Sequence, residues 1–253
     1  MERPHYKTVV SADVHLGAPH SKVREVSEFL SSVDCDRLIM NGDIIDGWQL
    51  HNSDDKWNSS HSAFFRVIMK MMENHSTEVI YVSGNHDDFL DPIVPSKLFN
   101  ISFVSEYILR EEKHSYVVIH GHAFDSITAR FRWISRLGDI GYNLLLKFNN
   151  MWNRARMRHG KEYYSFSKVI KHKVKQAVSL ISGFESDLEA FARARGCDGI
   201  ICGHIHNPED KMLKGGIHYL NSGDWVESLS ALVEDFDGNW SILRYNDFVK
   251  PQP

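Results

Sequence analysis

The sequence has few of the features that mark a secreted, disulfide-stabilised or membrane-spanning protein. Cysteine occurs three times in 253 residues, an odd number without the spacing of a zinc-binding motif. No apolar run approaches the ~18 residues that a membrane-spanning helix needs. The first seven residues lack the apolar stretch of a signal peptide. These absences lead us to expect a cytoplasmic protein whose cysteines are buried and structural.

A strong overall charge is also missing. The formal net charge is −4, while hydrophobic and charged residues make up 42% and 25% of the chain. These values are ordinary for a globular protein, and the net charge argues against a dedicated nucleic-acid-binding protein. The length allows one large core, or one core with a substantial insertion.

Strand and helix signals alternate through the first half of the chain. Because helices that separate strands imply crossover connections, we expect a largely parallel sheet in this half. Further short strands are expected near 101–119 and from residue 199 onward. The pattern predicts mixed β structure with flanking helices in two packed sheets. Strands are expected at 6–12, 37–40, 78–82, 116–119, 200–202, 217–220, 230–233 and 240–243, and helices at 21–33 and 62–72.

Five short polar motifs each follow one of these apolar runs. They offer carboxylate, amide and imidazole ligands without thiolate, a set that favours manganese, iron or zinc. Glycines adjoin four of them and allow sharp backbone turns. Together they can hold two adjacent divalent ions, which hydrolyse phosphate esters by lowering the pKa of a bound water and neutralising phosphoryl oxygens. The motifs are Asp13-Val14-His15, Gly42-Asp43-Ile44-Ile45-Asp46, Gly84-Asn85-His86-Asp87, His120-Gly121-His122 and Gly203-His204-Ile205-His206.

One segment differs in character from the rest of the chain. Residues 123–184 contain twelve Lys and Arg but only three acids, a net charge of +9 that leaves −13 for the remainder. The segment is also rich in aromatic residues, and apolar residues recur at helical spacing between 166 and 181. We therefore predict a helical cap at 123–184, inserted into an acidic core formed by 1–122 and 185–253.

The ordered motifs resemble those of the calcineurin-like metallophosphoesterases: D-x-H, G-D-x-x-D, G-N-H-D/E, H-G-H and G-H-x-H. The resemblance implies an α/β four-layer sandwich, α/β/β/α, with the metals at the strand ends. It implies two divalent ions, Mn²⁺ ahead of Fe or Zn, with one residue bridging them. The implied ligands are Asp13, His15, Asp43 and His206 for one metal, and the bridging Asp43, Asn85, His120 and His204 for the other.

His86 is the predicted catalytic residue, because an imidazole beside a metal ligand can protonate the leaving group, an effect typically worth about 10²- to 10⁴-fold. Asp46 and Asp87 are candidates to orient its ring, and Asp224 to hydrogen-bond a metal-binding imidazole. Trp48 is expected to serve packing, as is Trp225. Candidate substrate contacts are His122, Arg132, Lys168, Lys171 and His172. The alternative for His122 is support of the ligand His120, and the alternative for the residues in the cap is a solvated basic face.

The flanking residues carry a narrower resemblance, to the UDP-2,3-diacylglucosamine diphosphatase branch. Ile44–Trp48, Asn221–Ser228 and the basic insertion are similar to that branch, although His86 stands where its best-known members have arginine. The resemblance implies hydrolysis of UDP-2,3-diacylglucosamine to UMP and 2,3-diacylglucosamine 1-phosphate in lipid A biosynthesis. A basic, aromatic cap suits a nucleotide-linked lipid and a peripheral position on the cytoplasmic face of the inner membrane.

Two other functions compete with this reading. Basic residues interleaved with aromatics also suit single-stranded nucleic acid, so a phosphodiesterase acting on nucleic acid, or on another phosphorylated metabolite, is the alternative enzyme. The acidic core and the long apolar stripes of the insertion argue against nucleic acid. A non-catalytic scaffold is the third possibility, and it conflicts with the complete set of ligand motifs.

Overall fold

The computed structural model describes residues 3–52, 57–124 and 183–248. Most of the predicted cap, together with its candidate substrate contacts Arg132, Lys168, Lys171 and His172, lies outside the described residues. The chain divides into two compact units, Met1–His122 with Glu189–Pro253 and Ala123–Leu188. The sheets and the metal-binding motifs all belong to the first of these units.

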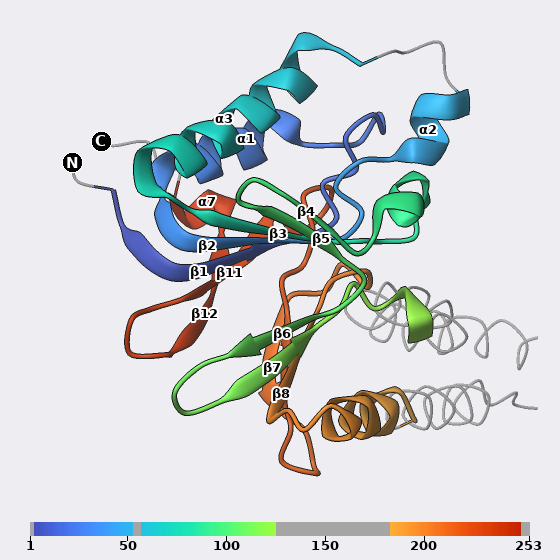
Figure 1. The fold of residues 1–253 in the computed structure, drawn as a ribbon, viewed down its shortest axis with the longest axis vertical. Coiled ribbons are helices and arrows are strands. Elements are labelled where there is room, and N and C mark those ends of the chain that lie inside the picture. Colours follow the sequence, from blue (N-terminus) through green and yellow to red (C-terminus); the bar gives the residue numbers. More distant parts are fainter. Residues whose placement is uncertain (1–2, 53–56, 125–182, 249–253) are drawn as a thin grey trace, which may run out of the picture. The chain divides into compact units, whose positions relative to one another are not determined.

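Seven strands form the first sheet, in the order β12-β11-β1-β2-β3-β5-β4 (Figure 1). The central strands β1, β2, β3 and β5 are parallel, whereas β11, β12 and β4 pair antiparallel with their neighbours. The strands are β1 (His5–Ser11), β2 (Asp34–Asn41), β3 (Glu78–Val82), β4 (Ser96–Leu98), β5 (Ile101–Val104), β11 (Ser230–Glu234) and β12 (Trp240–Arg244).

Five strands form the second sheet, in the order β6-β7-β8-β10-β9. Its centre is again parallel, β7 with β8 and β8 with β10, and its two edge strands are antiparallel. Both sheets are therefore mixed, as expected. The strands are β6 (Tyr107–Arg110), β7 (Ser115–Val118), β8 (Gly199–Cys202), β9 (Glu209–Met212) and β10 (His218–Asn221).

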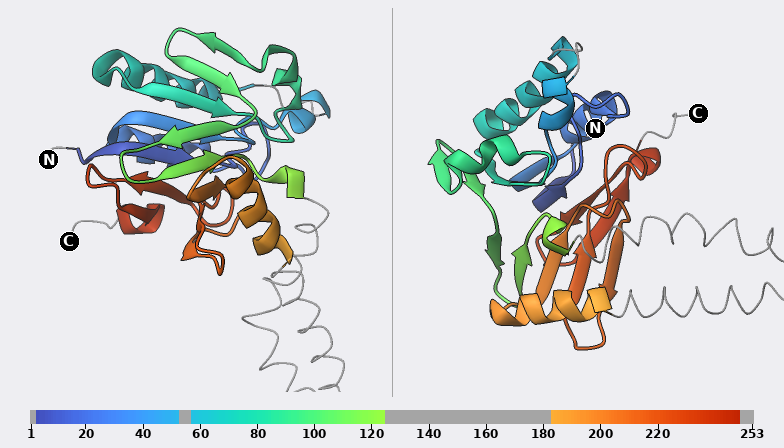
Figure 2. Two further views of the ribbon diagram at one scale, coloured as in Figure 1. Left: turned by 60° about the horizontal axis from the view of Figure 1, so that its bottom comes forward. Right: turned by 90° about the vertical axis from the view of Figure 1, so that its right-hand side faces the viewer.

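Side-chain alternation along the central strands builds two separate cores. Val9 and Leu38 face α1 (Val23–Ser32) and α3 (Ser59–His75), which cover the outer face of the first sheet. Val10 and Ile39, one residue later, face the second sheet in a core shared by both sheets (Figure 2). Because successive strand residues point to opposite faces, one apolar strand supplies both cores.

The remaining described elements are four short ones that follow strands and one longer helical stretch that precedes β8. None of the described helices is long and apolar enough to cross a membrane. These elements are α2 (Gly47–Asn52), α7 (Tyr245–Phe248), the 3₁₀ turns η1 (Asp88–Ile93) and η2 (His122–Phe124), and a helical stretch at 183–194 that leads into β8.

The predicted α/β fold with two mixed sheets is confirmed. The strand predicted at 78–82 matches β3, and the other strands and helices with predicted bounds agree to within a few residues at each end. The sequence pattern missed α2, the helical stretch at 183–194 and the edge strands β4 and β9. All three residues of β4 are exposed, and β9 has the polar sequence Glu-Asp-Lys-Met, so neither carries a core-facing apolar stripe.

Candidate metal centre

The five motifs meet at one edge of the two sheets. Asp13, Asp43 and Asn85 follow the carboxyl ends of β1, β2 and β3, while His120 and His204 follow those of β7 and β8. Parallel strands bring their carboxyl ends to the same edge, and the face-to-face packing of the sheets brings the two edges together. Segments separated by up to 193 residues thus share one site.

Five of the motif residues have a left-handed backbone conformation, which is uncommon for residues other than glycine. The values of φ lie between 50° and 63° for Asp13, His15, Asp43, His204 and His206. One residue separates His204 from His206, a spacing that predicts two ligands from an extended segment, and the left-handed backbone at both histidines shows that this prediction is wrong. Such strain concentrates at functional sites, where it aims side chains that a regular strand would direct elsewhere.

Two glycines let the backbone approach the carboxylates closely. A Cβ atom on Gly84 would lie 2.2 Å from Asp43 Oδ1, and one on Gly203 would lie 2.6 Å from Asp13 Oδ2. A side chain at either position would push the carboxylate away. At Gly84 and Gly203 it is therefore close packing against the carboxylates that requires glycine.

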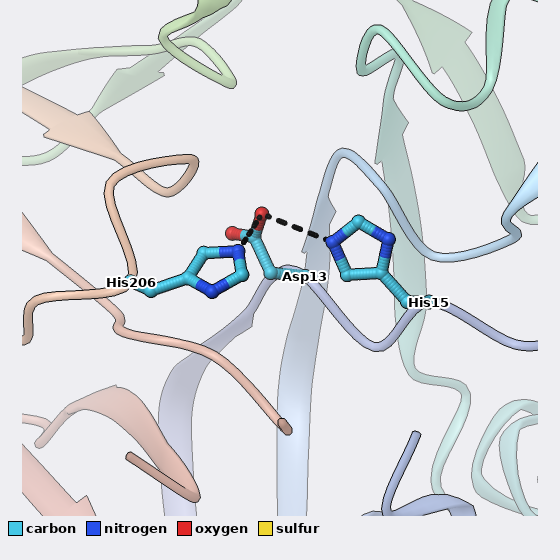
Figure 3. A group of neighbouring side chains, drawn as sticks. All are labelled: Asp13, His15 and His206. Carbon is cyan, nitrogen blue, oxygen red and sulfur yellow. Dashed lines mark ion pairs between the residues drawn. The ribbon is translucent and has the colours of Figure 1, made fainter. Parts of the chain in front are cut away.

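A first group of ligand atoms gathers around Asp13, and Figure 3 shows its three members. Asp13 Oδ1 lies 3.2 Å from His206 Nε2 and 3.8 Å from His15 Nε2. Atoms of the three residues lie within 4.8 Å of one another, which is close enough to share one ion.

A second group gathers around Asp43. It joins Asp43 to His120 and His204, with 3.2 Å between Asp43 Oδ2 and His120 Nε2. A further group within the same limit joins Asp43 to His15 and His86. Asp43 Oδ2 is 3.8 Å from His15 Nε2, so this carboxylate lies between the two ends of the site.

Several candidate ligands use one polar atom of the side chain for a hydrogen bond to the backbone. The other polar atom of the same side chain then points into the centre. Asp13 Oδ2 accepts the His204 backbone N–H at 2.8 Å, and Asp43 Oδ1 accepts that of His86 at 2.8 Å. His120 Nδ1 donates to the Asn41 carbonyl oxygen at 2.9 Å. Such bonds orient a metal ligand, as second partners of metal-binding side chains generally do. Sequence reasoning missed Asn41, a polar residue at the end of an apolar strand.

The donor set fits divalent metal ions. Several buried atoms of the motif residues make no hydrogen bond among the described residues, although buried polar atoms are normally hydrogen-bonded. They include Asp13 Oδ1, Asn85 Oδ1, His120 Nε2 and His206 Nε2. All are oxygen or imidazole donors from the converging motifs, and divalent ions bound at the His and Asp clusters would satisfy them.

The electrostatics of the centre favour cations. Burial by itself would raise the pKa of Asp13, but His120 and His206 hold this pKa well below its ordinary value. Burial lowers the pKa of His15, yet Asp13 and Asp46 outweigh it and raise the pKa to about 10. The buried carboxylates therefore stabilise positive charge at the imidazoles, and a metal ion competes with protons for that position.

His86 lies at the open side of the centre, with its imidazole 23% exposed. Its Nδ1 is 3.2 Å from Asp46 Oδ1, and its Nε2 is 4.0 Å from Asp43 Oδ2. The other oxygen of Asp46 lies 3.4 Å from His15 Nδ1. Asp46 thus contacts both a candidate ligand and the predicted catalytic imidazole, as the sequence led us to expect.

The other two predicted supporting carboxylates act on backbone instead. Asp87 accepts the Tyr81 hydroxyl at 2.8 Å and the backbone N–H groups of Ile44, Ile45 and Gly84, so it shapes the loop rather than the His86 ring. Asp224 accepts the N–H groups of residues 226, 227 and 228. Its Oδ1 lies 3.8 Å from His206 Nδ1, too far for the expected hydrogen bond to an imidazole.

His122 is the one predicted substrate contact among the described residues. It is exposed, in η2, and its ring centroid lies 5.6 Å from that of His120 and 6.5 Å from that of His204. It belongs to none of the ligand groups formed by described residues. Its place beside the centre is compatible with a substrate contact, which stays a prediction.

A comparison with protein families identifies the fold and the site together. The model of the calcineurin-like phosphoesterases matches residues 6–208, well over half of the chain. The chain belongs to this family. With its His and Asp clusters in place, it is a metal-dependent phosphoesterase with a dinuclear centre. No curated protein matches this phosphoesterase.

Several solved structures are similar at low identity. One is a conserved uncharacterised protein from Streptococcus pneumoniae TIGR4, a predicted phosphoesterase: 16% identity, 95% of this chain and 90% of that chain covered, TM-score 0.41. Another is a novel archaeal phosphodiesterase (13%, 93% and 98%, TM-score 0.44). A third is Vps29 of Entamoeba histolytica complexed with Zn²⁺ (12%, 94% and 99%, TM-score 0.42). The family assignment rests on the family model.

Proposed function

We propose that this phosphoesterase hydrolyses the diphosphate of UDP-2,3-diacylglucosamine, releasing UMP and 2,3-diacylglucosamine 1-phosphate. The sequence around Trp48 and at Asn221–Ser228 is similar to that of the UDP-2,3-diacylglucosamine diphosphatase branch, which supports the proposal. The +9 charge of residues 123–184 supports it as well. A basic, aromatic segment suits a diphosphate that carries acyl chains at an anionic membrane surface. The enzyme would then work as a peripheral protein on the cytoplasmic face of the inner membrane.

The metals would be held in two overlapping sets. When bound, two divalent ions supply positive charge for the phosphoryl oxygens and make a bound water acidic enough to react near neutral pH. Asp43 lies between the two groups of ligand atoms, so its carboxylate would belong to both sets. The first set is Asp13, His15, Asp43 and His206, and the second is Asp43, Asn85, His120 and His204.

The observation that carries the mechanism is the contact between His86 and Asp46. With Nδ1 lying 3.2 Å from the Asp46 carboxylate, the His86 ring is oriented so that Nε2 is directed toward the centre, 4.0 Å from Asp43 Oδ2. That Nε2–H can donate its proton to the oxygen of the departing group, or neutralise the charge that develops there. Asp46 is itself fixed, because its Oδ1 accepts the Gln49 backbone N–H at 2.9 Å.

The test is release of UMP from UDP-2,3-diacylglucosamine in detergent with added Mn²⁺, measured beside hydrolysis of bis(4-nitrophenyl) phosphate. We expect UMP in stoichiometric yield with the lipid phosphate. Hydrolysis of the chromogenic diester without UMP release would exclude the lipid substrate and leave the phosphoesterase activity standing. In that case a single-stranded DNA or RNA substrate, assayed at several salt concentrations, tests the alternative.

A further inference from the structure

Trp48 occupies an unusual place beside the proposed catalytic imidazole. It lies in the first turn of α2, two residues after Asp46, and it is 47% exposed. Its ring centroid is 4.2 Å from that of His86, with 34° between the planes. The sequence led us to expect a packing residue, which holds for the fully buried Trp225 but does not describe a half-exposed indole against an active-site ring.

The His86 imidazole is enclosed on three sides. Trp48 lies against it, His15 meets it edge-on at 4.8 Å and 86°, and Asp46 faces Nδ1. The His86 backbone is held by hydrogen bonds to Asp43 and Gly47, so what remains to be fixed is the rotation of its side chain. The aromatic contacts and the carboxylate determine where Nε2 points.

Trp48 is in turn held to the loop that carries His86. Its Nε1 donates to Asp88 Oδ2 at 3.2 Å, and the Gly47 N–H donates to the His86 carbonyl oxygen at 3.0 Å. A Cβ atom on Gly47 would lie 3.0 Å from that same oxygen and 2.7 Å from the Phe89 ring. The start of α2 and the 86–88 turn therefore form one closely bonded unit that delivers both the Asp46 carboxylate and the indole to His86.

We propose that Trp48 is a positioning residue for His86: the indole, anchored by Asp88, holds the imidazole so that Nδ1 meets Asp46 and Nε2 faces the metal centre. The inference rests on the catalytic role proposed above for His86. Misplacement of a reacting group by about 1 Å can cost about 100-fold in rate. Loss of the indole should therefore lower turnover without removing any ligand of the metals.

An alternative use of the ring is substrate binding, because Trp48 also lines a pocket of about 560 Å³ together with Trp57 and Phe89. Trp57 provides the matched control. It is 42% exposed and lines the same pocket, but it packs on His61 and Phe65 and donates to Ser62 instead of contacting His86. A role in the pocket should affect both tryptophans, whereas a role in positioning affects only Trp48.

The experiment measures kcat, KM and bound metal with bis(4-nitrophenyl) phosphate and Mn²⁺ for the wild type, Trp48→Ala, Trp48→Phe, Trp57→Ala, His86→Ala and the double variant Trp48→Ala/His86→Ala. For Trp48→Ala we expect kcat to fall about 10- to 100-fold with KM and metal content unchanged. Trp48→Phe should recover most of kcat, and Trp57→Ala should match the wild type. In the His86→Ala background, Trp48→Ala should cause no further loss.

Three results would overturn the inference. These are an equal loss from Trp48→Ala with and without His86, a rise in KM shared by Trp48→Ala and Trp57→Ala, or unchanged kinetics in Trp48→Ala. If Trp48→Ala fails to fold by circular dichroism, Asp88→Ala keeps the ring but removes its anchor, and the same kcat loss is expected. Full turnover in His86→Ala alone would instead reject the proposed role of His86.

Discussion

Two polar clusters lie along the same two strands, a partly buried one in their amino-terminal halves and a buried one beyond their carboxyl ends. Lys7 in β1 and Arg37 in β2, with Glu111 and Glu234, form what we call the ion-pair end. Asp13 and Asp43, beyond the other ends of β1 and β2, belong to the metal centre. Both clusters place carboxylates where water is scarce, so both need compensating positive charge.

The two clusters obtain that charge in different ways. At the ion-pair end the chain supplies it: Arg37 Nη1 donates to Glu111 at 2.9 Å and to Thr8 Oγ1 at 3.2 Å, and Lys7 pairs with Glu111. At the metal centre the partners of the carboxylates are imidazoles, which are only conditionally charged. A cluster that contains its own cations stabilises the fold, whereas one that lacks them can bind cations from solution.

Asp43→Ala is expected to have the largest effect, and to affect only the metal centre. Because Asp43 lies between both ligand groups, we expect loss of both metals and a fall in kcat of more than about 10³-fold, beyond what one lost electrostatic contact costs. Metal per protein by mass spectrometry and turnover of bis(4-nitrophenyl) phosphate check this. Glu111→Ala is the control at the other end and should keep its metals. An active, fully metallated Asp43→Ala would refute the bridging position.

The next largest effect is expected for His86→Ala. The imidazole belongs to a group with His15 and Asp43, so it could act as a ligand or as a proton donor. As a donor it should lose about 10²- to 10⁴-fold in kcat while retaining both metals. Metal content measured in the same preparations distinguishes the roles, since loss of one ion per chain would make His86 a ligand.

A smaller effect, on stability alone, is expected for Arg37→Ala. Its side chain is 22% exposed, and its removal leaves Glu111 with Lys7 as its remaining partner and removes the donor to Thr8 Oγ1. Hydrogen bonds to charged groups contribute about 1.5–3 kcal/mol, so the free energy of unfolding in urea should fall by about that amount. Arg24→Ala is the control, because its pair with Glu28 is exposed to solvent and such pairs contribute little to stability. If both variants lost the same free energy of unfolding, the ion-pair end would contribute no more to stability than an exposed ion pair.

The smallest effect is a pH dependence at Glu234. Burial raises the pKa of this carboxyl, and the nearby Glu111 charge raises it further. The folded protein therefore binds this proton more tightly than the unfolded chain, so the Glu234 contribution to stability falls as pH rises from the unfolded toward the folded pKa. Glu234→Gln does not titrate, so relative to the wild type it should gain stability between pH 4 and pH 8. Thermal melts across that range should show a difference in Tm between Glu234→Gln and the wild type that grows with pH. A difference that stays constant would contradict a raised pKa at Glu234.

Much of the fold could be predicted from single stretches of sequence. The β3 strand and the core-facing sides of α1 and α3 carry strong apolar periodicity, and the five motifs stand directly after such runs. Edge strands such as β4 could not be predicted, because an exposed edge carries no apolar pattern. Contacts such as that of Asp87 with Tyr81 depend on how a loop closes, and nothing in neighbouring residue types distinguishes this from a contact with His86.

The sequence by itself determined the reaction class, because carboxylate, amide and imidazole residues at strand ends are sufficient to indicate a two-metal phosphoesterase. Only the tertiary structure decided how those residues are used. The left-handed backbone at Asp13 and Asp43, the bonds that hold one polar atom of each ligand to the fold, and the contact of the Trp48 ring with His86 all depend on the packing of distant segments. The physical reason is that residue type sets which atoms can bind a metal or a proton, while packing sets the direction in which they point.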